Sequence, residues 1–237
     1  MSFKQTLKRI IPKLLHHLYN RVVSRGKIAS IYGDWFELDW KKTATNADDE
    51  TWKKVYNVSW EHWSQQDLSP LDLTKIEALV PENVTLLDAG CGDGYLLAHL
   101  LGKGRILSGV DLSETAIRKA RERLGNAVNL QTAFLEKLPY CDKEFDVVVS
   151  AHTLEHVKQF GAAVSELQRV CKQRLILLVP SQEYLPYTQD YHLHFFPKNE
   201  DFLNRVNIPN ARLERYTVSD GLCAYAGDVL LLVVDFA

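Results

Sequence analysis

The sequence predicts a doubly wound α/β fold, in which helices cover both faces of a mostly parallel sheet. From about Leu71 onward, short apolar segments typical of buried strands alternate with helical segments. One of these strands runs into a turn with glycines at alternate positions, followed by a helix. With 237 residues and 46% hydrophobic content, the chain can bury one sizeable core and at most one small accessory domain.

Five strands are expected to lie parallel, and two more to form an antiparallel pair at the edge of the sheet. The parallel strands are expected at residues 85–88, 105–110, 129–133, 145–150 and 174–179, with helices between them. The antiparallel pair is expected at residues 211–219 and 228–236, which lie close in sequence across Asp220-Gly221.

Residues 1–70 are expected to precede this domain, which covers residues 71–237. Residues 1–27 combine apolar residues at helical spacing with seven cations and no acid, a pattern typical of a basic amphipathic helix. Such a helix suits the surface of an anionic membrane, packing on the rest of the chain, or contact with a second subunit. Residues 28–70 contain all five tryptophans, which predicts a small helical cap with an aromatic core.

The glycine turn Asp88-Ala89-Gly90-Cys91-Gly92-Asp93-Gly94 indicates the kind of ligand. Dinucleotide sites space their glycines as G-x-G-x-x-G, so that the helix packs close to a pyrophosphate. Here the third glycine comes one residue early, and Tyr95 stands where the last dinucleotide glycine would be. Asp111 ends the next strand, where a carboxylate can accept hydrogen bonds from both ribose hydroxyls. A nucleoside without a pyrophosphate therefore fits this turn better than a dinucleotide.

Four motifs in this order resemble those of class I S-adenosylmethionine (SAM) methyltransferases, and most of all the group that contains the ubiquinone-biosynthesis O-methyltransferases. They are the glycine turn, Asp111, the strand 145–150 and Leu154-Glu155-His156-Val157. The resemblance covers residues 70–237 and implies a Rossmann-like, seven-stranded sheet with SAM as cofactor. The cofactor-binding residues that it implies are Asp88, Gly90, Cys91, Gly92, Gly94, Asp111, Leu112, Phe134, Leu135 and Ser150. Phe134 departs from the family, which often has an acid at this place to bind the adenine amino group.

Four residues are candidates for the chemistry of methyl transfer: His152, Glu155, His156 and His194. The first three are expected to share one helical face just after the fourth strand, so that two imidazoles and a carboxylate converge. His194 and its neighbour His192 follow the fifth strand, where this family has a loop that faces the acceptor, and one of them is a candidate base. The ubiquinone enzymes bind a divalent cation through a Glu-x-x-Glu-His arrangement, and here His152 replaces its first glutamate, which would favour a softer ion than magnesium. Short clusters with ligand spacing often prove structural, so no residue is assigned to a metal.

The resulting expectation is an enzyme that transfers a methyl group from SAM to oxygen or nitrogen of a small-molecule or glycan-precursor acceptor. One alternative is an RNA 2′-O-methyltransferase, disfavoured because residues 28–237 hold 30 acids and only 21 bases. Another is a SAM-binding protein without turnover. Four separated cysteines and the lack of a signal peptide or long apolar run favour a cytoplasmic protein, with peripheral membrane contact through residues 1–27.

Overall fold

A computed structural model of the chain describes residues 40–62, 68–184, 191–219 and 226–236. The described residues belong to two compact units, one holding residues 40–47 with Tyr191 and the other beginning at Asp48. The first unit contains the short helices α3 (Trp40–Thr43) and η1 (Ala44–Asn46). The second contains the whole sheet and every candidate site residue.

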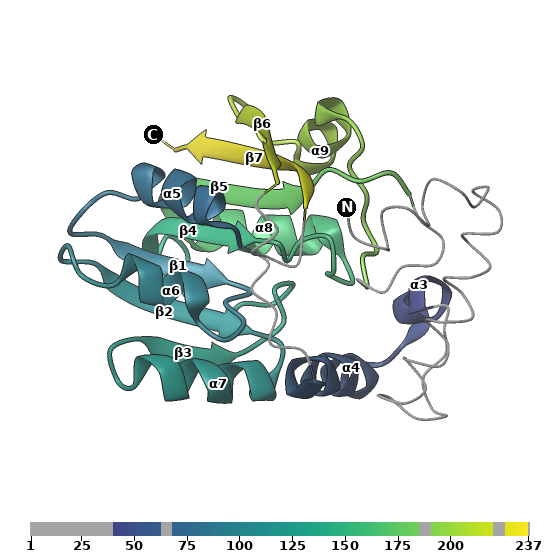
Figure 1. Cartoon of the computed structure of the whole chain (residues 1–237), viewed down its shortest axis with the longest axis horizontal. Helices are drawn as coiled ribbons and strands as arrows, with labels where there is room; N and C mark the ends of the chain where they lie inside the picture. The colour runs from purple at the N-terminus through teal and green to yellow at the C-terminus, as the bar shows by residue number, and fades with distance from the viewer. Residues whose placement is uncertain (1–39, 63–67, 185–190, 220–225, 237) are drawn as a thin grey trace. The chain divides into compact units, whose positions relative to one another are not determined.

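The second unit is built on one seven-stranded sheet with the order β3-β2-β1-β4-β5-β7-β6 (Figure 1). The strands are β1 (Thr85–Ala89), β2 (Ile106–Asp111), β3 (Asn129–Thr132), β4 (Phe145–Ala151), β5 (Cys171–Pro180), β6 (Arg212–Val218) and β7 (Gly227–Asp235). The first five pair in parallel, whereas β7 lies antiparallel between β5 and β6. The predicted fold class is confirmed, and every strand begins and ends within three residues of its expected bounds.

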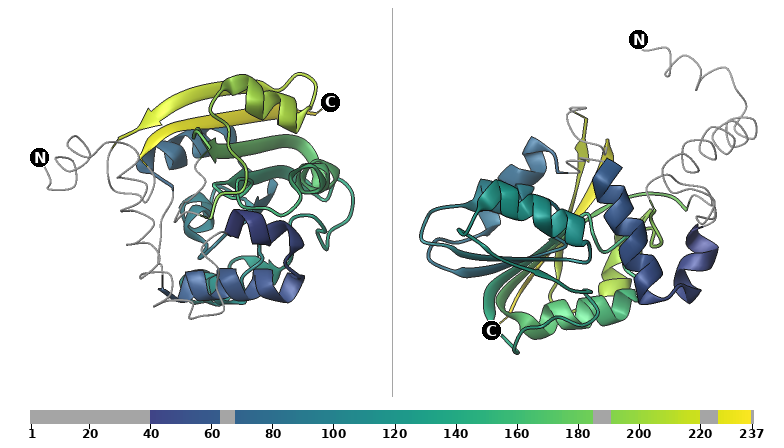
Figure 2. Two further views of the ribbon diagram at one scale, coloured as in Figure 1. Left: turned by 90° about the vertical axis from the view of Figure 1, so that its right-hand side faces the viewer. Right: turned by 90° about the horizontal axis from the view of Figure 1, so that it is seen from below.

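Helices cover both faces of the sheet, and each face has its own apolar cluster. α5 (Pro70–Leu79), α6 (Tyr95–Leu100) and α7 (Glu114–Leu124) contribute to the cluster on one face. α8 (Phe160–Val170) and α9 (Asn199–Val206) contribute to the cluster on the other. The right-hand view of Figure 2 shows α7 and α8 on opposite sides of the strands. The residues of β5 from Leu175 to Val179 are fully buried, as expected for a strand covered on both faces.

The helix α4 (Asp49–His62) lies beside α7 in the same unit as the sheet. It carries Trp52, which is buried and stacks on Tyr56. Of the five tryptophans, Trp35 and Trp63 lie outside the described residues. No helix in the described part of the chain is long and apolar enough to span a bilayer.

The parallel strands all end at the same edge of the sheet, and the chain leaves them there through turns rich in polar residues. β1 leads into the glycine turn, β2 ends on Asp111, and β4 leads into the segment that begins with His152. Ligands of doubly wound sheets bind at this edge, because the connections diverge there to opposite faces. The candidate active site therefore occupies the position that the topology favours.

Candidate active site

The glycine turn bends back against the end of β2. Gly90 and Cys91 donate backbone hydrogen bonds of 2.7 and 2.9 Å to the carbonyl of Val110. Gly90 has a φ of +87°, and a Cβ built there would lie 2.2 Å from Oγ1 of Thr153. A side chain at Gly90 would thus need a strained backbone and would displace the turn after β4. The conformation of this turn therefore requires glycine at Gly90.

Asp111 is connected to this turn through its carboxylate. Oδ2 accepts a hydrogen bond from Gly92 N at 2.9 Å, and Oδ1 accepts one from Ser113 N at 2.8 Å. Burial raises the pKa of Asp111 to about 6, although the two backbone donors oppose that change. Asp88 is buried one strand away, and burial together with the charge of Asp111 raises its pKa to about 8. Two carboxyl groups thus sit in a poorly solvated place beside the glycine turn.

A pocket opens between the glycine turn, the end of β4 and helix α4. The predicted residues Asp88, Gly90, Cys91 and Gly92 line it. Ala151 and His152 form its wall at the end of β4, and Trp60 of α4 lies across from the turn. Cys91 is buried, and burial raises the pKa of its thiol, so the sulfur is neutral and inert at neutral pH.

The remaining predicted cofactor residues lie around this pocket without lining it. Gly94 precedes the first residue of α6, and Leu112 connects Asp111 to the N-cap residue Ser113. Ser150 is fully buried, and its hydroxyl donates to the carbonyl of Ala89 at 2.8 Å. That bond joins the ends of β4 and β1, so Ser150 stabilises the edge of the sheet at which these two strands end.

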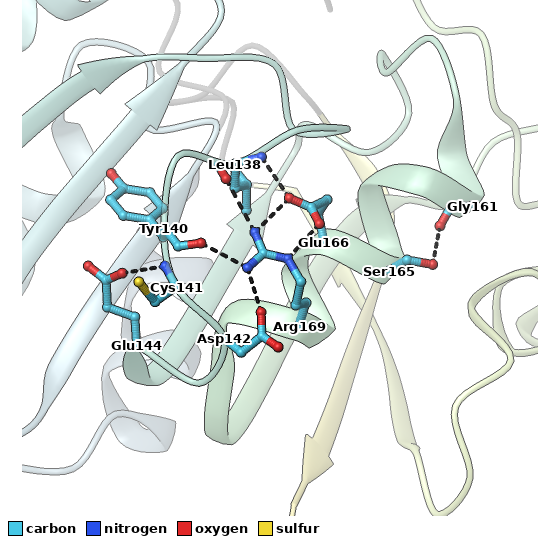
Figure 3. A network of polar contacts seen from close by, with 9 residues as sticks. All are labelled: Leu138, Tyr140, Cys141, Asp142, Glu144, Gly161, Ser165, Glu166 and Arg169. Carbon is cyan, nitrogen blue, oxygen red and sulfur yellow. Dashed lines mark hydrogen bonds and ion pairs between the residues drawn. The ribbon is translucent and has the colours of Figure 1, made fainter.

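Phe134 and Leu135 begin the loop after β3. Phe134 is half-buried, whereas the Leu135 side chain is buried in the apolar core beneath the loop. Farther along, this loop is held by Arg169 of α8 (Figure 3). The Arg169 guanidinium donates to the carbonyls of Leu138 and Tyr140 and to the Asp142 carboxylate. The same guanidinium pairs with both carboxylate oxygens of Glu166, at 2.6 and 2.8 Å.

The segment after β4 is a tight turn, and the expectation that His152, Glu155 and His156 share a helical face is wrong. α8 does not begin until Phe160, and His152 has a φ of +50°. The backbone bond from His156 N to Thr153 O closes the turn. Pairing of β4 with β5 extends through His152 N, which donates to Leu178 O. Because this strand pairing continues to His152, the few residues between His152 and Glu155 cannot form a helical turn.

The turn nevertheless brings an acid and two imidazoles together, and the second imidazole comes from a distant segment. One ligand atom from each of Glu155, His156 and His192 lies within 4.8 Å of the others. The rings of His156 and His192 meet edge to face, with centroids 4.7 Å apart. The Glu155 carbonyl accepts from Leu193 N and His194 N, at 2.7 and 3.0 Å. These two backbone bonds place His192 over the turn.

The Glu155 carboxylate is buried, at 1% exposure of its side chain. Neither of its oxygens accepts a hydrogen bond within the described part of the chain. Nδ1 of His152 lies 3.6 Å and Nε2 of His156 lies 4.0 Å from Oε1. Burial alone would raise the pKa of Glu155, but the three surrounding histidines outweigh it and lower the pKa to about 2. The three histidines therefore keep the buried Glu155 side chain in its carboxylate form.

His192 is held in one tautomer by a residue for which the sequence offers no signal. Its Nδ1 lies 2.7 Å from Oε1 of Gln182, an amide oxygen that can only accept. The proton therefore sits on Nδ1, and the lone pair is on Nε2. Gln182 belongs to no motif and follows β5 by two residues, so only the fold relates it to the cluster.

His194, the fourth candidate, is engaged elsewhere. Its Nε2 donates to Val157 O at 2.8 Å, and its Nδ1 accepts from Arg205 of α9 at 2.9 Å. Burial lowers the pKa of His194 to about 4. Both ring nitrogens thus support the loop, and the ring has no lone pair to offer an acceptor molecule. His192, two residues earlier, is the histidine that reaches the cluster.

Comparison with known proteins agrees with this geometry. Residues 87–179 match the family described as Methyltransferase domain. Over this segment the chain matches a methyltransferase domain, and the expected resemblance to class I SAM-dependent methyltransferases is confirmed. The segment runs from β1 through β5 and includes the glycine turn, Asp111 and the Glu155 turn.

Relatives and solved structures share this methyltransferase domain. The chain is 34% identical over 111 residues to a ubiquinone biosynthesis O-methyltransferase of Thiobacillus denitrificans, covering 45% of this chain and 48% of the relative. It is 35% identical over 100 residues to a malonyl-[acyl-carrier protein] O-methyltransferase of Buchnera aphidicola, covering 42% and 39%. The chain therefore spans about half or less of these relatives' lengths. A SAM-dependent methyltransferase structure from Aquifex aeolicus superposes with a TM-score of 0.54 at 19% identity, over 81% of this chain and all of that one, and shows the shared fold.

Proposed function

We propose that this protein is an enzyme that transfers the methyl group of SAM to a hydroxyl oxygen of a small-molecule acceptor. The observation that carries the proposal is the cluster of Glu155, His156 and His192 at the carboxyl end of β4. His152 joins this cluster to the cofactor pocket, because it lines the pocket and its Nδ1 lies 3.6 Å from Glu155. The two relatives described above are named as O-methyltransferases.

In the proposed complex, the glycine turn and Asp111 would hold the cofactor. Asp111 would accept from the ribose hydroxyls, and the pocket-lining residues Asp88 and Gly90 would contact the methionine portion. Phe134 and Leu135 flank the adenine with a ring face and backbone groups in place of the family's acid. The pocket wall at Ala151 and His152 then faces the methyl group.

Methyl transfer from a sulfonium is an in-line displacement. The acceptor oxygen forms a bond to the methyl carbon while the carbon–sulfur bond breaks, and sulfur keeps the electron pair. Positioning and exclusion of water lower the barrier, and a hydroxyl acceptor must also lose its proton. His192 is suited to take that proton at Nε2, because Gln182 keeps Nδ1 protonated. The buried charge of Glu155 stabilises the imidazolium that forms.

The same three residues fit a divalent cation, which the sequence did not lead us to expect. Two imidazoles and one carboxylate form a known ligand set for transition metals. The buried carboxylate of Glu155 supports this, because neither of its oxygens accepts a hydrogen bond of standard length within the described residues. The hydrogen bond that orients His192 from the far side of its ring supports it as well. A cation bound there would polarise the acceptor hydroxyl and lower its pKa. Imidazole ligands favour zinc, copper, iron or nickel over magnesium.

Calorimetry and a labelled-methyl assay test this function. Wild type should bind SAM and its demethylated product, and Asp111→Ala should weaken both at least tenfold. Methyl transfer to a panel of phenols, catechols and sugar alcohols should fall at least a hundredfold in Glu155→Gln and His192→Gln. His99→Gln, at a surface histidine paired with Glu77, is the matched control and should keep full activity. Wild type that binds SAM but labels no hydroxyl acceptor would contradict the enzyme proposal.

Removal of divalent cations distinguishes the two roles proposed for the cluster, which are proton acceptance by His192 and cation binding. If a cation is used, a chelator should abolish transfer and Mn²⁺ or Zn²⁺ should restore it. Activity that survives chelation would leave His192 as the base and rule out the cation. Methylation of RNA is the second candidate, and RNA affinity that falls steeply with salt would favour it.

A further inference from the structure

Helix α4 closes one side of the cofactor pocket from outside the sheet. Its residue Trp60 is half-buried and lines the pocket opposite the glycine turn. A Cβ built on Gly92 would lie 2.6 Å from Cζ2 of the Trp60 ring. The indole therefore rests against the bare backbone of Gly92, which a side chain at that position would prevent.

Polar bonds attach the same helix to the start of α7. Oδ1 of Asn57 accepts from Oγ of Ser113 at 2.8 Å and from Thr115 N at 3.2 Å. One turn farther along α4, the Lys119 ammonium donates to the Trp60 carbonyl at 2.6 Å. Asn57 and Trp60 lie three residues apart, so they project from the same side of the helix.

Two of the residues that α4 contacts donate backbone hydrogen bonds to Asp111. Trp60 covers Gly92, whose N–H binds Oδ2 of Asp111. Asn57 binds Ser113, whose N–H binds Oδ1. A continuous path of contacts therefore runs from Asn57 through Ser113, Asp111 and Gly92 back to Trp60.

We propose that α4 is part of the cofactor site: Trp60 packs on bound SAM, and Asn57 is a positioning residue that couples the docking of α4 to the Asp111 subsite. This inference rests on the proposed function, because it takes SAM as the occupant of the pocket. An indole supplies both apolar surface and a negative ring face, which suit the aliphatic part of the methionine chain and the sulfonium charge of this ligand.

Calorimetric affinities for SAM test both residues. Trp60→Ala should raise the Kd at least fivefold, and Trp60→Phe should recover part of that loss. Asn57→Leu should also raise the Kd, whereas Asn57→Asp should stay close to wild type because it keeps an acceptor oxygen toward Ser113 and Thr115. Glu61→Ala, at an exposed position of the same helix, is the control and should bind as wild type does.

Hydrogen exchange provides a measurement that a purely structural role would not affect. SAM should slow amide exchange in residues 50–62 of wild type, and this protection should be smaller in Asn57→Leu. A folded Trp60→Ala or Asn57→Leu variant with the wild-type Kd would overturn the inference. So would wild type that binds SAM without protection of α4. Wild type that does not bind SAM at all would instead overturn the proposed function.

Discussion

At the scale of single residues, the cofactor edge contains acids that are costly to ionise. Asp88 is buried beside Asp111, and its pKa is raised to about 8 from an ordinary value of 3.8. Between these two pH values the folded protein binds more protons than the unfolded chain, so the free energy of unfolding must fall as the pH rises through this window. The destabilising charges lie where a ligand is expected to bind.

We expect Asp88→Asn to remove this pH dependence in the cofactor-free protein. Relative to wild type, the variant should gain roughly 1–3 kcal/mol in free energy of unfolding between pH 5 and pH 8, because an amide never ionises. Urea unfolding at several pH values measures the difference. Asp146→Asn is the control, because hydrogen bonds from Thr85 lower the pKa of Asp146 and so give the opposite sign. If the free energy of unfolding depends on pH in the same way in wild type and in Asp88→Asn, the raised pKa of Asp88 is contradicted.

At the scale of elements, α8 holds the loop that follows β3. Arg169 binds two loop carbonyls and two carboxylates at once, while Glu166 accepts from Leu138 N at 2.8 Å. Only a guanidinium has enough donors, in a planar fork, to make all of these bonds. The pKa of Glu166 is lowered by the Arg169 hydrogen bond, so the pair stays charged. An element on one face of the sheet thereby positions residues expected near the adenine.

Arg169→Lys should therefore affect both stability and cofactor binding. We expect a loss of about 1–2 kcal/mol in free energy of unfolding, because an ammonium cannot replace the fork and leaves carbonyls unpaired. SAM affinity should fall several-fold, since the loop carries Phe134 and Leu135. Arg118→Lys is the matched control: its ion pair with Glu122 is exposed and should be worth under about 0.5 kcal/mol. If Arg169→Lys is destabilised but binds SAM with the wild-type Kd, the loop does not contribute to the cofactor site.

At the scale of the whole molecule, charge is distributed unevenly along the chain. The net charge is only −2, yet seven cations precede the first acid, Asp34. They are Lys4, Lys8, Arg9, Lys13, Arg21, Arg25 and Lys27, and they lie outside the residues that the structure describes. Contact with an anionic membrane through residues 1–27 therefore stays a prediction. Such contact would bring the active site near a lipid-linked acceptor.

Vesicle co-sedimentation tests this contact with the full chain. Anionic vesicles at low salt should bind the protein, with about 1 kcal/mol from each cation near the surface. A variant with glutamine at all seven positions should remain in the supernatant, and zwitterionic vesicles should bind neither protein. Equal sedimentation of the two proteins would refute the prediction and favour a packing role for this segment.

The sequence by itself determined the fold class, the strand positions and the cofactor edge. These features follow from local patterns: apolar runs mark the strands, and the glycine spacing with Asp111 marks the turn. The number of strands and the antiparallel hairpin followed from the resemblance, whereas the strand order comes from the structure, in which parallel pairing brings the motifs to one edge.

Only the tertiary structure decided which side chains meet there. His192 joins Glu155 and His156 because backbone bonds from Leu193 and His194 reach the Glu155 carbonyl across more than thirty residues. His194 lies two residues after His192 and is an equal candidate in the sequence, but its two ring nitrogens are hydrogen-bonded to Val157 and Arg205. Gln182 and Trp60 belong to no motif. Gln182 reaches the site from the end of β5, and Trp60 reaches it from α4, a helix that packs outside the sheet. Side-chain convergence depends on contacts between segments far apart in the chain, and local sequence patterns do not record such contacts.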